Sequence, residues 1–459
     1  MFTEMRVNNF KSWPASGSIR LEPVTAFFGT NSSGKTSLLQ ALLLLKQSAE
    51  SVDRRQVLNL GDGRSLISLG LMTDIFHNHD PESRLEFAVS WNDETLSKEL
   101  RESVSDIELG RSVNYSFNTQ IMLDRTNSPY VQELVYVGAG IHIKYTRLGP
   151  RKGYDLKVCV NGQHDYLMRH RGRPSGFPPP SKYYGFPDES FKRFQNADFL
   201  SLFELSLQQQ FDGVYYLGPL RRRPDREYRW QGSVPSGVGV SGERTIEALL
   251  ASETRPKKEW IARKLRKNGY PVKRERVQQV VREWLQELEL VETFDVERIA
   301  PDVDLYKVMI QRTPDSAMVL LPDVGFGVSQ VLPVLGLLAS VPEGSVVILE
   351  QPELHLHPSV QSGLADIILE TTRVRRAQVI VESHSEHLLT RIQRRIAEEK
   401  HSKESVALYF CAQDEGRSRI EPLGLDEFGR ISNWPRDFFG DLMGEAGAIV
   451  EAGVRRSQR

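Results

Sequence analysis

The 459-residue chain is poor in cysteine and has no long hydrophobic run. Its two cysteines, Cys159 and Cys411, cannot form a disulfide framework or a cysteine-based zinc site, which fits a reducing compartment. The most apolar stretch, residues 331–341, contains a proline and is shorter than the roughly 20 residues that cross a bilayer. The N-terminus lacks the basic and apolar regions of a signal peptide. We therefore expect a cytoplasmic protein without membrane association.

An excess of charge of one sign is also absent, because Lys and Arg total 59, Asp and Glu total 60, and the net charge is −1. This balance excludes a globally basic chain of the histone type and an acidic tail protein. One stretch departs from it: residues 255–282, from Arg255 to Arg282, hold eleven Lys or Arg against Glu259 and Glu275, a local balance of +9. We expect helices with a basic face that contacts DNA or RNA. A solvated face or an interface for an acidic partner is the alternative.

The clearest motif is rich in glycine and serine. Residues 29–36 (GTNSSGKT) match the pattern G-x-x-x-x-G-K-[ST] of a phosphate-binding loop, between an expected strand at 20–28 and an expected helix at 37–47. In such a loop backbone N–H groups surround the phosphates, Lys35 adds a charge between the β and γ phosphates, and the Thr36 hydroxyl is the expected Mg²⁺ ligand. A serine-rich turn before a helix is the alternative. The residues predicted to bind the nucleotide here are Gly29, Asn31, Ser32, Ser33, Gly34, Lys35, Thr36 and Ser37.

Two apolar strands far along the chain end in polar clusters. Residues 346–350 (VVILE) end at Glu350, the acid expected to hold the magnesium ion. Residues 379–384 (VIVESH) end at His384. Before both strands, the glycine-rich residues 323–330 (DVGFGVSQ) lead into an apolar helix, whose N-terminus predicts a second anion site. Two such sites on one chain indicate that the second site of one monomer covers the nucleotide bound by another.

These motifs, in this order and preceded by residues 9–12 (NFKS), resemble the ATPase heads of the ABC class. Within that class the chain is similar to the branch of SMC, RecF and OLD proteins. Four further strings narrow the resemblance to AAA family ATPases of bacterial anti-phage defence loci, the group that includes the Septu ATPase PtuA. They are EQPELHLHP at 350–358, ESHSEHLL at 382–389, YLGPLRRRPDREY at 216–228 and FGRISNWPRDFF at 428–439.

The resemblance implies a role for each motif. Gly325, Gly327 and Ser329 would form the signature motif, which contacts the nucleotide across a head-to-head homodimer. Gly325 stands where the family usually has serine. Glu350 would be the Walker B acid and a ligand of Mg²⁺, as Thr36 would be.

Residue 351 departs from the pattern of the class, because Gln351 stands where most ABC ATPases have the glutamate that activates the attacking water. An amide can orient water but has no useful basicity at neutral pH. Either Glu350 or Glu353 acts as the base, or hydrolysis is slow and ATP mainly clamps the heads together. We favour slow turnover. The residues predicted to act in catalysis are Lys35, Glu350, Gln351 and His384.

Four histidines follow the two distal strands. The resemblance places residues 355–358 in the D-loop at the dimer interface and makes His384 the switch histidine that senses the γ-phosphate. The spacing of His355, His357, His384 and His387 is also compatible with a transition-metal cluster. We favour the ATPase roles, which already account for these positions.

The expected fold is an α/β P-loop NTPase of the ABC-ATPase head type, with an antiparallel β lobe and a helical insertion. Residues 84–160 predict an antiparallel meander, and the strings MVLLP, SVVILE and QVIVESH predict parallel β–α units. The Pro- and Gly-rich residues 161–190 predict a loop excursion outside the core. The expected parts are the N-terminal half of the head (1–240), a basic helical insertion (241–300), the C-terminal half of the head (301–425) and a docking tail (426–459).

Together these features predict an ATPase that uses ATP and Mg²⁺. The leading hypothesis is that nucleotide-dependent homodimerisation controls a separate effector, a nuclease or a reverse-transcriptase system, in anti-phage defence. No acid cluster of the Toprim kind follows the ATPase motifs, so we expect the effector on another chain. A RecF-like DNA-repair or recombination ATPase is the alternative, and a scaffold that uses nucleotide only as an assembly ligand is the third hypothesis.

Overall fold

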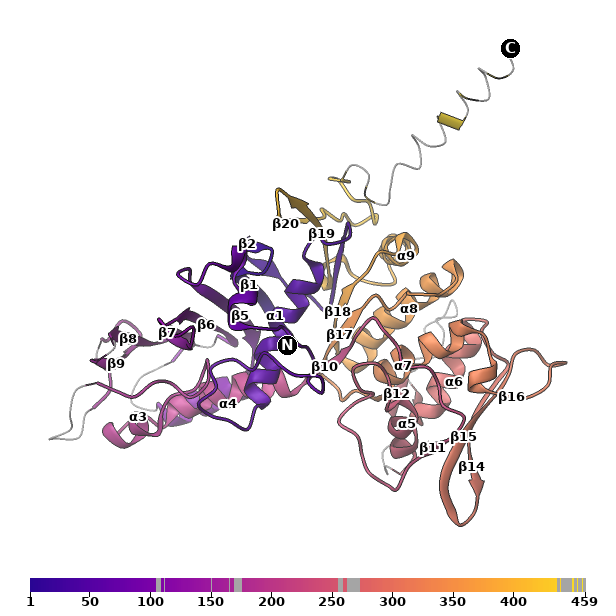
Figure 1. Cartoon of the computed structure of the whole chain (residues 1–459), viewed down its shortest axis with the longest axis horizontal. Helices are drawn as coiled ribbons and strands as arrows, with labels where there is room; N and C mark the ends of the chain where they lie inside the picture. Colours follow the sequence, from indigo (N-terminus) through magenta and orange to yellow (C-terminus); the bar gives the residue numbers. More distant parts are fainter. Residues whose placement is uncertain are drawn as a thin grey trace.

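A six-stranded, mostly parallel sheet lies at the centre of the molecule, with an antiparallel β lobe to one side and a helical lobe with a long β ribbon to the other (Figure 1). The computed structural model describes residues 1–104, 109–110, 112–149, 151–164, 166–168, 176–254, 259–261, 273–435 and 438, and positions 448, 449, 452 and 456. No helix among these residues is long and apolar enough to cross a membrane.

The strands of the central sheet are β4 (Val24–Gly29), β10 (Val214–Leu217), β17 (Val346–Glu350), β18 (Gln378–Glu382), β19 (Val406–Asp414) and β20 (Arg417–Pro422). Their order is β10-β17-β18-β4-β19-β20. The first five are mutually parallel, and the edge strand β20 runs antiparallel to β19. Every residue of β4, β17 and β18 is buried, which explains their nearly continuous apolar sequences.

A helix follows each of the three buried strands. These helices are α1 (Lys35–Glu50), α8 (Pro358–Arg375) and α9 (Glu386–Ala397). Successive residues of each strand point to opposite faces, so Phe27 and Ile348 join one core and Phe28 and Val347 join the other. The parallel β–α units predicted for SVVILE and QVIVESH are therefore confirmed.

The meander predicted for residues 84–160 is confirmed as an antiparallel sheet with the order β2-β1-β5-β6-β7-β8-β9, in which β3 also pairs with β1. Helix α4 crosses the lobe and contacts both α1 and α2. The elements of this lobe are β1 (Phe2–Phe10), β2 (Trp13–Ala15), β3 (Ile19–Arg20), β5 (Leu85–Asn92), α2 (Glu94–Ser103), β6 (Asn114–Leu123), β7 (Pro129–Gly138), β8 (Ile141–Gly149), β9 (Gly153–Val160), α3 (Asp188–Arg193) and α4 (Phe199–Asp212). Short 3₁₀ helices occur at Met72–Ile75, His77–His79, Leu321–Asp323 and Lys403–Ser405.

The prediction that residues 161–190 lie outside the core is wrong. Five aromatic side chains from this segment are buried in the β lobe, and backbone carbonyls of the segment accept hydrogen bonds from Thr119 (3.0 Å) and Tyr136 (2.8 Å) in the sheet. Proline and glycine correctly indicate irregular backbone, but aromatic rings still bury large apolar areas from such a segment. The buried residues are Tyr166, Phe177, Tyr183, Tyr184 and Phe186.

The helical insertion predicted at 241–300 has helices but is not helical throughout. The region contains α5 (Thr245–Glu253) and α6 (Val277–Glu287), but also the antiparallel pair β12 (Glu259–Ile261) and β13 (Lys273–Glu275) and the strand β14 (Thr293–Ala300). The described backbone of the basic stretch between α5 and α6 is thus strand, not a helical face. Residues 255–258 and 262–272, which hold most of its basic side chains, lie outside the described residues.

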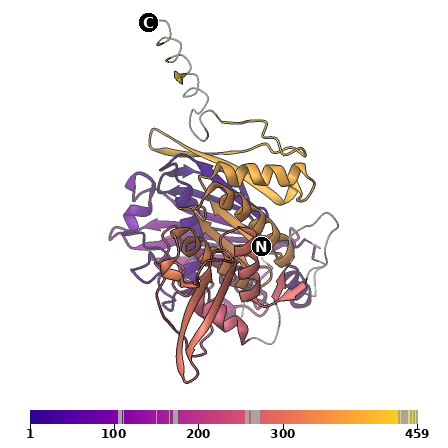
Figure 2. The same cartoon turned by 90° about the vertical axis from the view of Figure 1, so that its right-hand side faces the viewer.

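A long ribbon of β14 and β15 (Val303–Gln311) extends away from the rest of the molecule (Figure 2). The strands β11 (Tyr228–Arg229) and β16 (Val319–Leu320) pair with two successive stretches of β15, on the edge that does not pair with β14. Since β16 comes from the string MVLLP and pairs antiparallel, the prediction of a parallel strand there is wrong. The ribbon leads through a 3₁₀ turn into α7 (Phe326–Ser340) of the helical lobe.

Candidate nucleotide-binding site

The predicted phosphate-binding loop joins β4 to α1 at the carboxyl edge of the central sheet. Gly29 has φ +138°, and a Cβ there would lie 2.0 Å from the backbone carbonyl oxygen of Cys411. Gly34 has φ +89° and is the N-cap of α1, while Ser32 is left-handed at φ +60°. The strand, loop and helix predicted around this motif are confirmed, and two of its positions require glycine.

The side chain of Lys35 folds into this loop. Its Nζ donates to the carbonyl oxygens of Gly29 (3.1 Å) and Thr30 (2.7 Å). Burial lowers the pKa of Lys35, and the nearby Glu382 carboxylate opposes that shift. Of the remaining predicted loop residues, Ser33 is buried, Asn31 and Ser32 are exposed at the tip, and Ser37 is half-buried in the first turn of α1.

The N-terminal NFKS string lies against the loop. Trp13 Nε1 donates to the carbonyl oxygen of Gly34 at 2.9 Å. Ser418 on β20 donates through its hydroxyl to Ser12 at 2.7 Å, and a Cβ on Gly34 would meet both hydroxyls at less than 3 Å. The end of the string, at Ser12, and the following Trp13 therefore lie beside the phosphate-binding loop, although β3 lies between them and the loop in the sequence.

The acid that contacts the Thr36 hydroxyl is Glu382, at the end of β18. Thr36 Oγ1 lies 3.0 and 2.8 Å from the two carboxylate oxygens of Glu382 and can donate to one of them at a time. The sequence interpretation missed this residue and expected only Glu350, at the end of β17, to complete the site. The two acids are in register on adjacent parallel strands. The signal was present, because both strands are apolar runs that end in glutamate.

Glu350 lies one strand further from the loop and is held by a residue of β10 and a residue of the loop that follows it. Tyr216 Oη donates to its Oε1 at 3.1 Å, and Arg221 Nη2 donates to its backbone carbonyl at 3.4 Å. Burial, assisted by the charge of Glu382, raises the pKa of Glu350 to about 7. Burial raises the pKa of Glu382 as well. The edge therefore holds two carboxylates that are costly to charge without a cation.

Gln351 lies beside the same carboxylates. Its backbone is left-handed at φ +43°, and its N–H donates to the backbone carbonyl of Glu382 at 2.8 Å. A hydrogen bond from its side chain lowers the pKa of Glu382, although burial outweighs that effect. The amide of Gln351 thus lies at the carboxyl edge, where a catalytic base would be expected, but contacts a carboxylate.

His384 and Glu353 connect the two strand ends. The backbone N–H of His384 donates to Glu353 Oε1 at 2.6 Å. Burial and the charge of Lys35 lower the pKa of His384, so the imidazole favours its neutral form. Ser385, the next residue, caps α9 by accepting from Leu388 N–H at 3.0 Å. His384 is therefore fixed at the start of α9, close to the phosphate-binding loop.

The signature residues lie in the helical lobe. Gly325 is the N-cap of α7, and Ser329 is buried with its hydroxyl donating to the carbonyl of Phe326 at 2.8 Å. Among the described side chains, the one nearest to a Cβ at Gly327 is that of Leu290, at 3.9 Å. Within the described part of the chain no hydrogen bond or ion pair links these residues to the phosphate-binding loop. The structure brings Lys35, Glu350, Gln351 and His384 to one edge but does not bring the signature residues to it.

The histidines of the predicted D-loop flank the start of α8. His355 is exposed and left-handed at φ +63°, and His357 caps α8 by accepting from Ser359 N–H at 3.3 Å. Across all described residues, no group of three or more His, Cys, Asp or Glu side chains could hold a metal ion by itself. The alternative of a histidine metal cluster therefore has no support.

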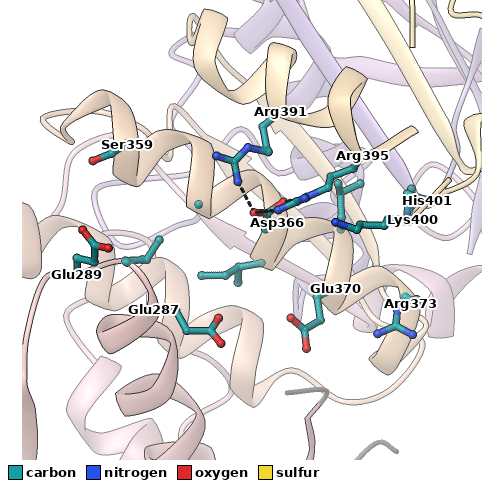
Figure 3. A pocket seen from close by; sticks show the side chains of 14 residues that line it. Glu287, Glu289, Ser359, Asp366, Glu370, Arg373, Arg391, Arg395, Lys400 and His401 are labelled. Atoms are coloured by element: carbon teal, nitrogen blue, oxygen red, sulfur yellow. Dashed lines mark hydrogen bonds and ion pairs between the residues drawn. The ribbon is translucent and has the colours of Figure 1, made fainter. Parts of the chain in front are cut away.

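Helices α8 and α9, which begin after the predicted D-loop and the predicted switch histidine, are joined by ion pairs (Figure 3). Asp366 on α8 accepts from Arg391 at 2.6 Å and from two nitrogens of Arg395 at 2.5 and 2.7 Å. Nearer the strand ends, the Ser385 hydroxyl donates to Gln361 at 2.6 Å. A pocket of about 350 Å³ lies beside these pairs, between α6, α8 and α9. These contacts tie the two motifs into one unit.

Two models of ATPase families match the stretches of the chain that contain this site. Residues 1–129, which include the phosphate-binding loop, match the family model described as an AAA ATPase domain. Residues 169–390, which include Glu350 and Glu382, match a model described as an AAA domain, whose description also names the AbiEii toxin and a type IV toxin–antitoxin system. Over these two stretches the chain is similar to AAA ATPase domains. Residues 402–449 match a family of unknown function, DUF3696. No curated protein matches the chain.

Solved structures with a similar chain course are heads of SMC proteins. An SmcHead bound to the C-winged helix domain of ScpA is 12% identical with a TM-score of 0.45, over 93% of this chain and 98% of that one. The SMC head domain from Thermotoga maritima is 11% identical with a TM-score of 0.41, over 92% and 99%. An Smc head with an extended coiled coil, bound to the C-terminal domain of ScpA derived from Pyrococcus furiosus, is 10% identical with a TM-score of 0.45, over 98% of both chains. These resemblances are distant.

Proposed function

We propose that the protein is an ATP-binding, slowly hydrolysing ATPase whose nucleotide-dependent homodimerisation controls a separate effector. The observation that supports this most is the division of the site. The phosphate-binding loop and the carboxylates gather at one edge of the sheet, whereas Gly325, Gly327 and Ser329 lie in another lobe without a described bond to them. A second protomer would supply the signature residues, so that one nucleotide lies between the phosphate-binding loop of one head and the signature motif of the other.

Mg²⁺ fits the chemistry of this edge. Thr36, Glu350 and Glu382 offer oxygen ligands, and the raised pKa of both buried acids means that a cation would stabilise their charged forms. Mg²⁺ is usually held by one or two carboxylates together with phosphate oxygens and water, so a cage of three protein ligands is not needed. When bound, the ion would neutralise charge on the phosphates. Lys35 would bind the phosphates, and Thr36 and Glu382 would orient the ion.

The contacts of residue 351 support the proposal of slow hydrolysis. The Gln351 amide interacts with Glu382 and cannot take a proton from water at neutral pH. Glu353 is buried and its Oε1 already accepts a hydrogen bond from His384. Glu350 keeps one carboxylate oxygen for Tyr216. ATP would therefore persist long enough to hold the two heads together.

The test is single-turnover ATP hydrolysis by the wild type and by Gln351→Glu. A glutamate at this position adds a base, and we expect the rate to rise by about 100-fold, in the range that general bases contribute. Gln361→Glu is a control, since Gln361 on α8 contacts Ser385 and not the acids at the strand ends. Equal rates for wild type and Gln351→Glu would contradict the slow-clamp proposal.

A role in anti-phage defence is part of this proposal. The description of the family matched by residues 169–390 names a toxin of a toxin–antitoxin system, which supports a role in controlling a toxic effector. A nuclease or a reverse-transcriptase system on another chain is the effector we propose. Contact with DNA or RNA through residues 255–282 stays a prediction, as does a docking role for residues 426–459.

A further inference from the structure

Arg221 lies in the loop that follows β10 and reaches the end of β17. Its Nη2 donates to the backbone carbonyl of Glu350 at 3.4 Å. Its Nε and Nη1 are buried and have no hydrogen-bond partner among the described residues. Buried polar groups are almost always hydrogen-bonded, and a guanidinium has donors but no acceptor. These two nitrogens are therefore hydrogen-bond donors for which the described residues provide no acceptor.

The neighbouring acids, Glu350 and Glu353, do not accept hydrogen bonds from these two nitrogens of Arg221. One oxygen of the Glu350 carboxylate accepts from Tyr216, and Oε1 of Glu353 accepts from His384 N–H. Oε2 of Glu353 is itself buried and has no partner within the described part of the chain. Burial lowers the pKa of Arg221 to about 10, against the opposing effect of Tyr216 and the two acids, so the group is still a cation at neutral pH.

The position of Arg221 relates it to the phosphate-binding loop. Both Arg221 and Lys35 interact electrostatically with Glu353. Strands β10, β17, β18 and β4 are parallel neighbours, so Arg221 and Lys35 follow strands whose ends meet at the same edge. An anion that extends from Lys35 along this edge would move towards the free donors of Arg221.

We propose that Arg221 binds the terminal phosphate of a nucleoside triphosphate held at the P-loop, so that the loop after β10 distinguishes triphosphate from diphosphate. The proposal rests on the nucleotide-binding function proposed above. Guanidinium groups suit phosphate because several N–H donors lie in one plane. Tyr216 contributes by holding the Glu350 side chain, which leaves the guanidinium of Arg221 bonded only to a backbone carbonyl of β17 among the described residues.

The test is equilibrium binding of a fluorescent, non-hydrolysable ATP analogue and of the matching ADP analogue, in the presence of Mg²⁺. Arg221→Gln should weaken binding of the triphosphate by about tenfold or more and change that of the diphosphate by less than about twofold, because one charge-assisted bond is lost. Arg221→Lys keeps the charge but not the planar donors and should fall between. Arg223→Gln, two residues further on and exposed, is the matched control and should bind both analogues as the wild type does.

The outcomes separate this proposal from the function on which it rests. If the wild type binds neither analogue, nucleotide binding itself fails. If the wild type prefers the triphosphate and Arg221→Gln keeps that preference, or loses both affinities equally, the assignment of Arg221 is overturned. Thermal unfolding of each variant checks the fold. If Arg221→Gln does not fold, Arg221→Lys becomes the deciding variant. A preference of Arg221→Lys for the triphosphate that equals that of the wild type contradicts the proposal, and a reduced preference supports it.

Discussion

Glu204, on α4, shows how strongly burial acts on a single carboxylate of the β lobe. It accepts a hydrogen bond from the backbone N–H of Phe186, yet burial raises its pKa to about 7, with a smaller contribution from Asp188 and an opposing one from Arg54. The unfolded chain releases this proton near pH 4.5. Because the folded state holds the proton longer, stability falls as the pH rises from about 4.5 to about 7.

Glu204→Gln should therefore stabilise the protein at pH 8, where the wild-type carboxylate is charged in both states. The glutamine carbonyl can still accept from Phe186, so we expect a gain of about 1–3 kcal/mol at pH 8 and a smaller gain at pH 5. Urea unfolding at both pH values measures this difference. Glu99→Gln, at an exposed position of α2, is the control and should have little effect. An equal gain at the two pH values would show that ionisation is not the cause.

At the level of single residues, the sequence predicted the phosphate-binding loop well because its pattern is local. Lys35, Thr36 and the two strained glycines fall within eight consecutive positions, so one motif contains them. Glu382 was missed because its contact with Thr36 joins residues 346 positions apart and depends on which strand lies between β17 and β4. Strand order is a property of the folded sheet, and no local pattern specifies it.

At the level of elements, the contact between β4 and β19 depends on Gly29. This residue pairs with Cys411, and a Cβ at Gly29 would lie 2.0 Å from the Cys411 carbonyl oxygen. We expect Gly29→Ala to cost about 1–2 kcal/mol for its backbone conformation and a further 1–3 kcal/mol for the clash between the strands. It should also weaken ATP binding, because the loop begins at this residue.

Gly17→Ala is the matched control for this prediction. Gly17 has φ +67°, but a Cβ added there would meet no atom of the described chain within 4 Å, so only the backbone cost of about 1–2 kcal/mol should remain. Chemical denaturation of both variants gives the difference. If Gly29→Ala is as stable as Gly17→Ala, the close approach of β19 does not constrain the loop.

Elements were predicted best where apolar runs and turns repeat, as in the meander of β5 to β9. The errors have a common physical origin. The aromatic residues at 166–186 are placed by tertiary packing despite the surrounding prolines, and Val319–Leu320 pairs with the ribbon strand β15 although its sequence resembles a buried parallel strand. Short apolar runs do not specify a partner strand, so their direction depends on the rest of the fold.

At the level of the whole molecule, the candidate nucleotide-binding site is built from both ends of the chain. The central sheet combines β4 from the first 30 residues with β17, β18 and β19 from beyond residue 345. The lobe that carries Gly325 is separate from the loop that carries Lys35. If the proposed function holds, a complete site requires two protomers. A chain with a defective loop and a chain with a defective signature should then restore activity to each other when they are mixed.

Lys35→Ala removes the phosphate-binding cation, and Gly325→Glu places a negative charge at the start of α7. No heavy atom of the described residues lies within 4 Å of a Cβ at Gly325, so the second variant should fold normally. Each variant alone should lose ATP hydrolysis. In a mixed dimer, however, the intact loop of one protomer meets the intact signature of the other. Random mixing gives half of the dimers as mixed, each with one of two sites intact, and thus about a quarter of wild-type activity.

Single-turnover hydrolysis by the equimolar mixture measures this recovery, and sedimentation with ATP reports the dimer directly. Gly63→Glu is the matched control, because it adds the same charge at another open position and should behave as the wild type. A mixture as inactive as either variant would contradict a site shared between protomers. Recovery to about a quarter would require that the loop at Gly29 and the helix start at Gly325, some 300 residues apart, act on one nucleotide from two different chains.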